Sequence, residues 1–236
     1  MLRRPFSINT ADPATGTITL HFRTVGRGTD WLSRVRPGER LDILGPLGRP
    51  FEVDPRSRHL LLIAGGMGIA GVRMLADEAV RDGSQVVLLF GAANASLVYP
   101  SNLLPDEVEY VVATDDGSLG HRGFVTELLA EYEAWADQAF ACGPHVMLKR
   151  LAELAAGRRE RLGVAKLGRK GGGRTDPIGS TAARRKAFLQ VSMEQNMGCA
   201  VGACLGCVVT GVKGPQRVCR EGPVFASDEI SWETIA

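Results

Sequence analysis

"HLLLIAGGMGIAGVRMLADEAVRDG", residues 59–83, joins an apolar run, a glycine-rich turn and an amphipathic segment. The run at 59–65 is short, apolar and ends at glycines, which is typical of a buried strand. After the turn, apolar residues recur at helical spacing: Ile69, Val72, Leu75, Ala76 and Ala79. A strand that turns tightly into a helix predicts the first unit of a parallel α/β sheet.

The same alternation continues along the chain. Further strands are predicted at 85–92, 108–117 and 138–144, and helices at 124–132 and 145–156. Strands that alternate with helices form parallel sheets because each crossover helix covers one face. We therefore predict an α/β domain over residues 56–156.

The first 55 residues have a different pattern. "TITLHFRTVG" (17–26) alternates and is rich in β-branched and aromatic residues, and "RLDILGPLGRPF" (40–51) is a short apolar run with Gly/Pro turns. Both patterns predict strands. Two strands are too few for a complete barrel, so residues 1–55 are predicted to form only part of one.

Composition limits the choice of partners and compartment. The chain has 236 residues, of which 44% are hydrophobic and 23% charged, and its formal net charge is +2. Such a small net charge does not favour nucleic acid or an anionic membrane as a partner. The sequence has no run of about 18 apolar residues that could span a bilayer. We expect a cytoplasmic protein, in which clustered cysteines bind metal more often than they form disulfides.

Four cysteines lie near the end of the chain in the pattern C-x4-C-x2-C-x11-C. They are Cys199, Cys204, Cys207 and Cys219. This spacing is the plant-type arrangement around a 2Fe-2S cluster, whereas zinc sites more often pair two C-x2-C knuckles. Small residues between the cysteines suit a loop whose backbone wraps an inorganic core. Residues 187–236 are therefore predicted to form a 2Fe-2S module, with structural zinc and unligated thiols as the alternatives.

A basic stretch separates the α/β region from the cysteines. Residues 157–186 contain ten Lys and Arg but two acidic residues, with a Gly triplet and no sustained periodicity. This composition predicts a flexible linker or an insertion. A solvated loop without any partner is the plainer alternative.

The turn after the first α/β strand contains G-x-G-x-x-G at Gly66, Gly68 and Gly71. Backbone amides at a helix N-terminus suit a nucleotide pyrophosphate. A dinucleotide fold of the Rossmann type also has a carboxylate at the end of its second strand, and "LLFGAANAS" (88–96) has none. The turn thus indicates a nucleotide phosphate without that fold's ribose contact, or else a plain strand-to-helix turn.

Several segments resemble the ferredoxin-reductase superfamily. "RRPFSI" (3–8) resembles its R-P-[FIL]-S flavin motif, and "GRGTDWLSRVRPGERLDILGPLG" (26–48) resembles the segment that follows that motif. "GGMGIAG" (65–71), "TDDGS" (114–118) and "CGPHVM" (142–147) resemble its pyridine-nucleotide domain. The tail, "SMEQNMGCAVGACLGCVV" (192–209) with "RVCREGPVF" (217–225), closely resembles the cluster segment of electron-transfer subunits of dihydroorotate dehydrogenase B.

The resemblance implies cofactor contacts in all three parts. Arg4 would pair with the FAD pyrophosphate and Ser7 would lie near the isoalloxazine N5. The full implied FAD set is Arg4, Pro5, Phe6, Ser7, His21, Phe22, Arg23, Gly28 and Thr29. The implied NAD set is Gly65, Gly66 and Gly68 at the pyrophosphate, Asp115 and Asp116 near the cofactor end of the sheet, and Cys142, Gly143 and Pro144 near the nicotinamide. The family has several tens of residues before the flavin motif where this sequence has three, which again implies a partial barrel.

The resemblance also implies the activity. In the dihydroorotate dehydrogenase B family, an FMN-containing catalytic subunit oxidises dihydroorotate in pyrimidine biosynthesis, and electrons reach NAD through the 2Fe-2S cluster and FAD. A heterotetramer of two catalytic and two electron-transfer subunits is implied, and we expect no acid–base or nucleophilic catalysis by side chains. Two alternatives stay open: the flavin subunit of a hydrogenase or ferredoxin:NADP reductase complex, and a non-enzymatic metal-binding redox regulator.

Overall fold

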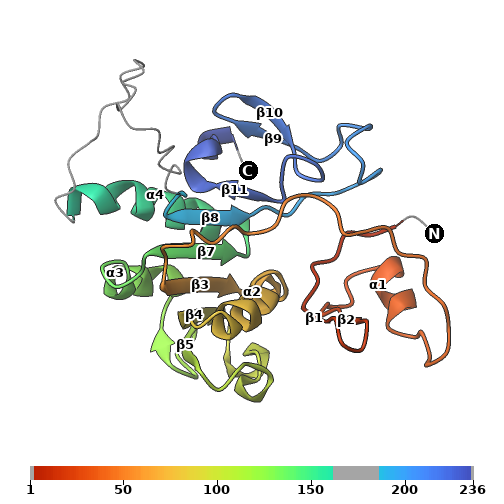
Figure 1. Cartoon of the computed structure of the whole chain (residues 1–236), viewed down its shortest axis with the longest axis horizontal. Coiled ribbons are helices and arrows are strands. Elements are labelled where there is room, and N and C mark those ends of the chain that lie inside the picture. Colours follow the sequence, from red (N-terminus) through yellow and green to blue (C-terminus); the bar gives the residue numbers. More distant parts are fainter. Residues whose placement is uncertain (1–2, 162–185, 235–236) are drawn as a thin grey trace, which may run out of the picture.

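The computed structural model describes residues 3–161 and 186–234 (Figure 1). Its centre is a seven-stranded sheet in the order β11-β8-β7-β3-β4-β5-β6. The strands are β3 (His59–Gly65), β4 (Gln85–Ala92), β5 (Val108–Thr114), β6 (His121–Arg122), β7 (Gln138–Cys142), β8 (Leu189–Ser192) and β11 (Val224–Ala226). All neighbours pair in parallel except β11 with β8. The predicted α/β fold is confirmed.

Helices cover both faces of this sheet, so its central strands are apolar on both faces over most of their length. Along β3, Leu60, Leu62 and Ala64 pack with α2 (Ile69–Arg81), which follows the short 3-10 turn Gly66–Gly68. The alternate residues, Leu61 and Ile63, pack with α4 (His145–Arg161). Successive side chains of a strand point to opposite faces, which explains this division.

Two predicted helices have different bounds in the structure. The helix predicted at 124–132 is a 3-10 turn, Val125–Leu128, followed by the short α3 (Leu129–Tyr132). The last helix, α4, continues beyond residue 156 to Arg161, so residues 157–161 of the predicted linker are helical. Residues 162–185 of that predicted linker lie outside the described residues, and Lys186 at its end is described again.

The cysteine-rich tail contributes strands to the main sheet. Strand β8 pairs with β7, and β11 pairs with β8, so both extend the sheet from one side (Figure 1). Between them lies a separate hairpin of β9 (Val208–Gly211) and β10 (Gly214–Arg217), and the tail ends in two 3-10 turns, Ser227–Glu229 and Trp232–Thr234. The predicted boundary at residue 187 stays a prediction, but part of the module shares the core of the α/β domain.

The N-terminal segment contains less strand than its sequence predicts. It has a small hairpin of β1 (Thr10–Asp12) and β2 (Thr17–Thr19), followed by α1 (Arg27–Leu32). The strand predicted at 17–26 ends at Thr19. The prediction of a strand at 40–51 is wrong, because among the described residues this stretch pairs only through one bridge between Arg49 and Pro223. A strand forms only where a neighbour supplies hydrogen bonds, and among the described residues none lies along these stretches.

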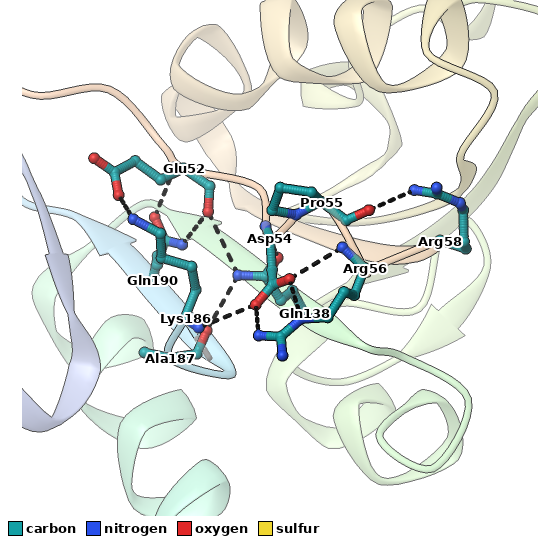
Figure 2. Close-up of polar contacts among 9 residues, drawn as sticks. All are labelled: Glu52, Asp54, Pro55, Arg56, Arg58, Gln138, Lys186, Ala187 and Gln190. Atoms are coloured by element: carbon teal, nitrogen blue, oxygen red, sulfur yellow. Dashed lines mark hydrogen bonds and ion pairs between the residues drawn. The ribbon is translucent and has the colours of Figure 1, made fainter. Parts of the chain in front are cut away.

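Hydrogen bonds connect residues 52–54, at the end of the N-terminal segment, with strands β7 and β8 of the sheet, as Figure 2 shows. The backbone N–H of Glu52 donates to the Gln190 side chain at 2.9 Å, and the Gln190 amide donates back to the Glu52 carbonyl at 2.6 Å. The N–H of Asp54 donates to Gln138 Oε1 at 2.6 Å. Buried glutamines on β7 and β8 thus replace the strand pairing that residues 52–54 lack.

Candidate cofactor sites

The β9–β10 hairpin brings together cysteines that are distant in sequence. Cys207 immediately precedes β9, and Cys219 lies just after β10. The N–H of Val218 donates to the Cys207 carbonyl at 3.0 Å, and the N–H of Cys219 donates to Cys207 Sγ at 3.5 Å. Both of these thiols are buried, while Cys199 is half-buried and Cys204 is exposed.

The loop that carries the first three cysteines directs backbone amides at sulfur. The N–H groups of Ala203 and Cys204 donate to Cys199 Sγ at 3.3 and 3.4 Å, and the N–H of Gly206 donates to Cys204 Sγ at 3.4 Å. Hydrogen bonds to Cys199, first from the N–H of Cys204 and then from the N–H of Val201, lower the pKa of Cys199 to about 6. The thiolate, which is the metal-binding form, is therefore favoured at neutral pH.

Left-handed backbone gives this loop its curvature. Ala200, Gly202 and Leu205 have φ values of 61°, 80° and 57°. Such conformations are costly for residues other than glycine and concentrate at functional sites. The curvature turns successive N–H groups toward the sulfurs, as the small residues in the sequence predict.

The four sulfurs are arranged in two pairs. Cys199 is hydrogen-bonded to the Cys204 thiol, and the pKa of Cys219 is raised by burial and then by its hydrogen bond with Cys207. Across the described residues no three metal-binding side chains gather closely enough to hold a single ion. A 2Fe-2S cluster distributes its four thiolates over two irons. Two pairs of thiols match this distribution over two irons.

The implied FAD residues come from the N-terminal segment. A Cβ built on Gly28 would lie 3.2 Å from Arg4 Nε, so the Arg4 side chain packs directly on the start of α1. The rings of Phe6 and Phe22 meet edge to face at 5.7 Å. Pro5 and Arg23 are exposed. The structure thus brings Arg4 to Gly28 and Phe6 to Phe22.

Thr29 has a local function at the same helix. Its Oγ1 accepts the N–H groups of Val25 at 2.9 Å and Gly26 at 3.2 Å. These are donors at the start of α1, where the helix leaves backbone N–H groups unpaired. Thr29 therefore stabilises the turn that the resemblance assigns to the FAD phosphates.

The flavin motif lies against the α/β domain at the carboxyl end of β7. A Cβ on Gly71 would lie 2.8 Å from Cys142 Sγ and 3.7 Å from Ser7 Oγ. His21 contacts the same domain, with its ring 5.4 Å from that of Tyr99. Ser7 and Cys142, which the resemblance assigns to the flavin and the nicotinamide, are thus neighbours.

Cys142 is fully enclosed at this junction. It is 1% exposed, and burial raises its pKa to about 12. Its thiol therefore stays neutral at physiological pH and does not act as a nucleophile.

The glycines of the turn differ in what surrounds them. A Cβ on Gly68 would collide with the Cys142 carbonyl, and one on Gly65 would lie 2.6 Å from Met147 Sδ. Gly66, at φ 52°, has no atom within 4 Å of a built Cβ. Gly65 and Gly68 thus allow close packing with β7 and α4, and Gly66 faces the open space that a pyrophosphate would need.

The remaining implied NAD residues follow the carboxyl ends of strands β5 and β7. Asp115 is exposed directly after β5, and its N–H donates to the Ala92 carbonyl at the end of β4 at 3.0 Å. Asp116 Oδ1 accepts the hydroxyl and the N–H of Ser118, which lower the pKa of Asp116 and fix the turn. Gly143 at φ 158° approaches Gly65, with 3.0 Å from its built Cβ to the Gly65 nitrogen.

Sequence reasoning missed two residues of this junction, Tyr99 and Met147. Tyr99 is buried in a loop after β4, where it meets His21, and Met147 packs on the glycine turn from α4. No local pattern marks Tyr99, and the CGPHVM segment includes Met147 without assigning it a contact, because both contacts depend on elements distant in sequence.

Comparison with known proteins identifies the family of this chain. The family model for the iron-sulfur cluster binding domain of dihydroorotate dehydrogenase B matches residues 194–231. A Desulforamulus reducens protein named dihydroorotate dehydrogenase B (NAD(+)), electron transfer subunit, is 36% identical over 240 residues, which cover 99% of this chain and 81% of that protein. This chain belongs to that family. Proteins of the same name from Geobacillus thermodenitrificans and Listeria monocytogenes are 34% and 31% identical, each over 98% of this chain and over 80% and 81% of their own length.

Two solved structures share the fold of this chain. The NADH-dependent reduced ferredoxin-NADP oxidoreductase superposes with a TM-score of 0.77 at 25% identity, over 98% of this chain and 75% of that one. A ferredoxin reductase of carbazole 1,9a-dioxygenase, at 20% identity and a TM-score of 0.53, covers 65% of this chain and 51% of its own and shares the fold. The predicted family and its oxidoreductase class are confirmed. No helix in the described part of the chain is long and apolar enough to cross a membrane.

Proposed function

We propose that this electron transfer subunit binds a 2Fe-2S cluster through Cys199, Cys204, Cys207 and Cys219. FAD binds along the N-terminal segment and NAD binds at the glycine turn. An FMN-containing catalytic subunit supplies electrons from dihydroorotate, in an assembly of two catalytic and two electron transfer subunits. The cysteine loop carries the proposal, since its amides point at paired thiols within a segment matched by an iron-sulfur family model.

The bound cofactors supply the redox chemistry, because a flavin exchanges electron pairs with a nicotinamide and single electrons with an iron-sulfur cluster. The protein contributes placement. Ser7 of the flavin motif lies near Gly71 of α2, and Gly71 also adjoins the neutral thiol of Cys142. Gly66 leaves backbone accessible for a pyrophosphate, and Arg4 offers a planar guanidinium for the phosphates of FAD.

The first test is anaerobic co-expression with a candidate FMN subunit, followed by a visible spectrum and assays of iron and flavin per chain. We expect about two irons for one 2Fe-2S cluster and one FAD, with absorption that is bleached by NADH. Iron without FAD would contradict the flavin assignment, and zinc without colour would contradict the redox function.

The cysteine ligands are tested by Cys207→Ser in the same preparation, with Cys142→Ser as the matched control. We expect the Cys207 variant to lose the cluster absorption, whereas the Cys142 variant retains its iron because that thiol lies outside the cysteine loop. Equal iron contents in the two variants would contradict the ligand assignment.

A further inference from the structure

Arg217 links the two parts of the chain that carry the cysteines. It is the last residue of β10 and lies two positions before Cys219. Its Nη1 donates to the Gly202 carbonyl at 3.0 Å, and Gly202 lies in the loop between Cys199 and Cys204. One side chain therefore closes the loop against the strand that leads to the fourth cysteine.

Glu221 fixes the orientation of this guanidinium. The backbone N–H and the Nε of Arg217 donate to Glu221 Oε2 at 2.7 and 2.9 Å, and Nη2 pairs with Oε1. Both side chains are partly buried, at 29% and 27% exposure. A two-pronged pair of this kind has defined geometry, which leaves Nη1 free to reach Gly202.

The surroundings of Gly202 leave little freedom in this contact. Gly202 has φ 80°, and a Cβ there would lie 3.3 Å from Arg217 Nη1 and 3.1 Å from Arg220 Cδ. A side chain at this position would be strained and would crowd the guanidinium. The loop is therefore shaped to receive an arginine from β10.

Arg217 also lies close to the buried thiols. It precedes Cys219 by two residues, and the N–H of Val218 between them donates to the Cys207 carbonyl at 3.0 Å. Four thiolates around two irons carry net negative charge, and nearby charges and hydrogen bonds set the reduction potential of such a cluster.

We propose that Arg217, oriented by Glu221, is a positioning residue that closes the cysteine loop around the 2Fe-2S cluster and sets a fixed positive charge beside it. This inference rests on the proposed function, because it requires the cluster. It assigns retention of iron and tuning of the potential to two residues outside the ligand set.

The test compares Arg217→Gln with Arg220→Gln in the complete chain, purified anaerobically with its cofactors. Each variant removes one positive charge near Cys219, but the exposed side chain of Arg220 makes no hydrogen bond within the described parts of the chain. We expect iron release to a chelator to be about tenfold faster in the Arg217 variant, as for other losses of outer-shell contacts. In the Arg220 variant it should stay near the wild-type rate.

Redox titration monitored by EPR separates positioning from general damage. Arg217→Gln should shift the cluster potential to more negative values, and Glu221→Gln should shift it to more positive values, because the two variants remove opposite charges. A purely structural role would not give shifts of opposite sign. Arg217→Lys keeps the charge and loses the fork, so we expect faster iron release with a nearly unchanged potential.

The outcomes distinguish this inference from the proposed function. A wild-type chain without iron or visible absorption would contradict the cluster itself. A wild-type chain with the cluster, combined with identical iron release and potential in Arg217→Gln and Arg220→Gln, would overturn the role of Arg217 alone.

Discussion

The sheet and the N-terminal segment of this molecule are stabilised in different ways. The central strands of the sheet are closed on both faces, and Leu60, Leu88 and Phe140 are 0% exposed. From residue 3 to residue 50 only Asn9 is buried, while Trp31 is 51% and Ile43 is 62% exposed. The α/β domain has its own core, whereas the flavin-side segment is held by local hydrogen bonds and by contacts with its neighbours.

This contrast indicates that the two regions contribute differently to stability and to cofactor binding. A core of closely packed side chains fixes the ends of the strands, where the nucleotide turn and Cys142 lie. A segment with few buried apolar contacts belongs to the low-stability end of a structure, and such regions become ordered around ligands. We therefore expect substitutions in the sheet to change global stability and substitutions near α1 to change FAD binding.

The largest effect is expected for Phe140→Ala. Phe140 lies on β7 and its ring is 5.5 Å from that of Phe51. Loss of a buried phenyl ring leaves a cavity, which lowers the free energy of unfolding by about 3–5 kcal/mol. Chemical denaturation of wild type and variant measures the change. The matched aromatic substitution in the N-terminal segment, Trp31→Ala, should change the free energy of unfolding by less than about 0.5 kcal/mol. Equal losses in the two variants would contradict the difference in stability between the two regions.

A smaller effect is expected for Gly68→Ala, which separates packing from binding within the turn. The added methyl collides with the Cys142 carbonyl, and overpacking of this kind costs about 1–3 kcal/mol. The methyl group of Gly66→Ala would contact no neighbouring atom. This variant should lower the free energy of unfolding only by the cost of left-handed backbone for alanine, about 1–2 kcal/mol.

The two glycine variants should differ most in nucleotide affinity. We expect Gly66→Ala to weaken NADH binding more than its change in stability explains, because its methyl enters the open space at the turn. Calorimetric NADH titration and thermal unfolding of both variants check this. A Gly66 variant with wild-type affinity would place the pyrophosphate elsewhere.

A pH-dependent effect is expected at Asp54, which joins the two regions. Its carboxylate accepts three hydrogen bonds from Arg56, at 2.7 to 3.0 Å, and one from the N–H of Lys186 at 3.2 Å. The Arg56 side chain first, and then its N–H, hold the pKa of Asp54 well below its usual range. A depressed folded-state pKa stabilises the protein above the unfolded value of about 3.9, and the contribution is lost as the pH falls below it.

Asp54→Asn should therefore be less stable than wild type at pH 7, and the difference should shrink below about pH 4. Unfolding at a series of pH values between 3 and 7 measures this. Asp42→Asn is the control, since its carboxylate is 81% exposed and pairs with Arg3 at the surface. A constant gap between Asp54→Asn and wild type over the whole range would contradict the assignment.

Local patterns predicted the parts of this molecule that depend on local sequence. The apolar run at 59–65, the helix after it and the cysteine spacing each lie within one short window. The addition of β8 and β11 to the sheet depends on strands of four and three residues that pair with distant partners, which no periodicity reveals. The missing strand at 40–51 has the same cause, because a strand pattern does not specify whether a partner is present.

The candidate sites divide in the same way. The cysteines were identified from spacing, whereas the contact of Arg217 with Gly202 and the approach of Ser7 to Cys142 arise only when distant segments fold together. The glycines illustrate a further limit. Sequence alone assigns Gly66 and Gly68 to one motif, but the structure gives one of them open space and the other a tight contact.

The smallest change in global stability is expected for Thr29→Ala, which lies in the N-terminal segment. Loss of the hydroxyl leaves the N–H groups of Val25 and Gly26 without their acceptor, and a lost cap of this type costs about 1 kcal/mol. Because α1 contributes no buried residue, this cost should not reach the core, and the melting temperature should stay close to wild type. It should appear instead as weaker FAD binding, by about fivefold for 1 kcal/mol.

Thr29→Ser should restore the affinity for FAD. Ser33→Ala, which removes a hydroxyl bonded to the Asp30 carbonyl at the other end of α1, should have less effect. A melting temperature lowered as far as in Phe140→Ala would show that the segment unfolds together with the sheet, and the two regions would then form one cooperative unit.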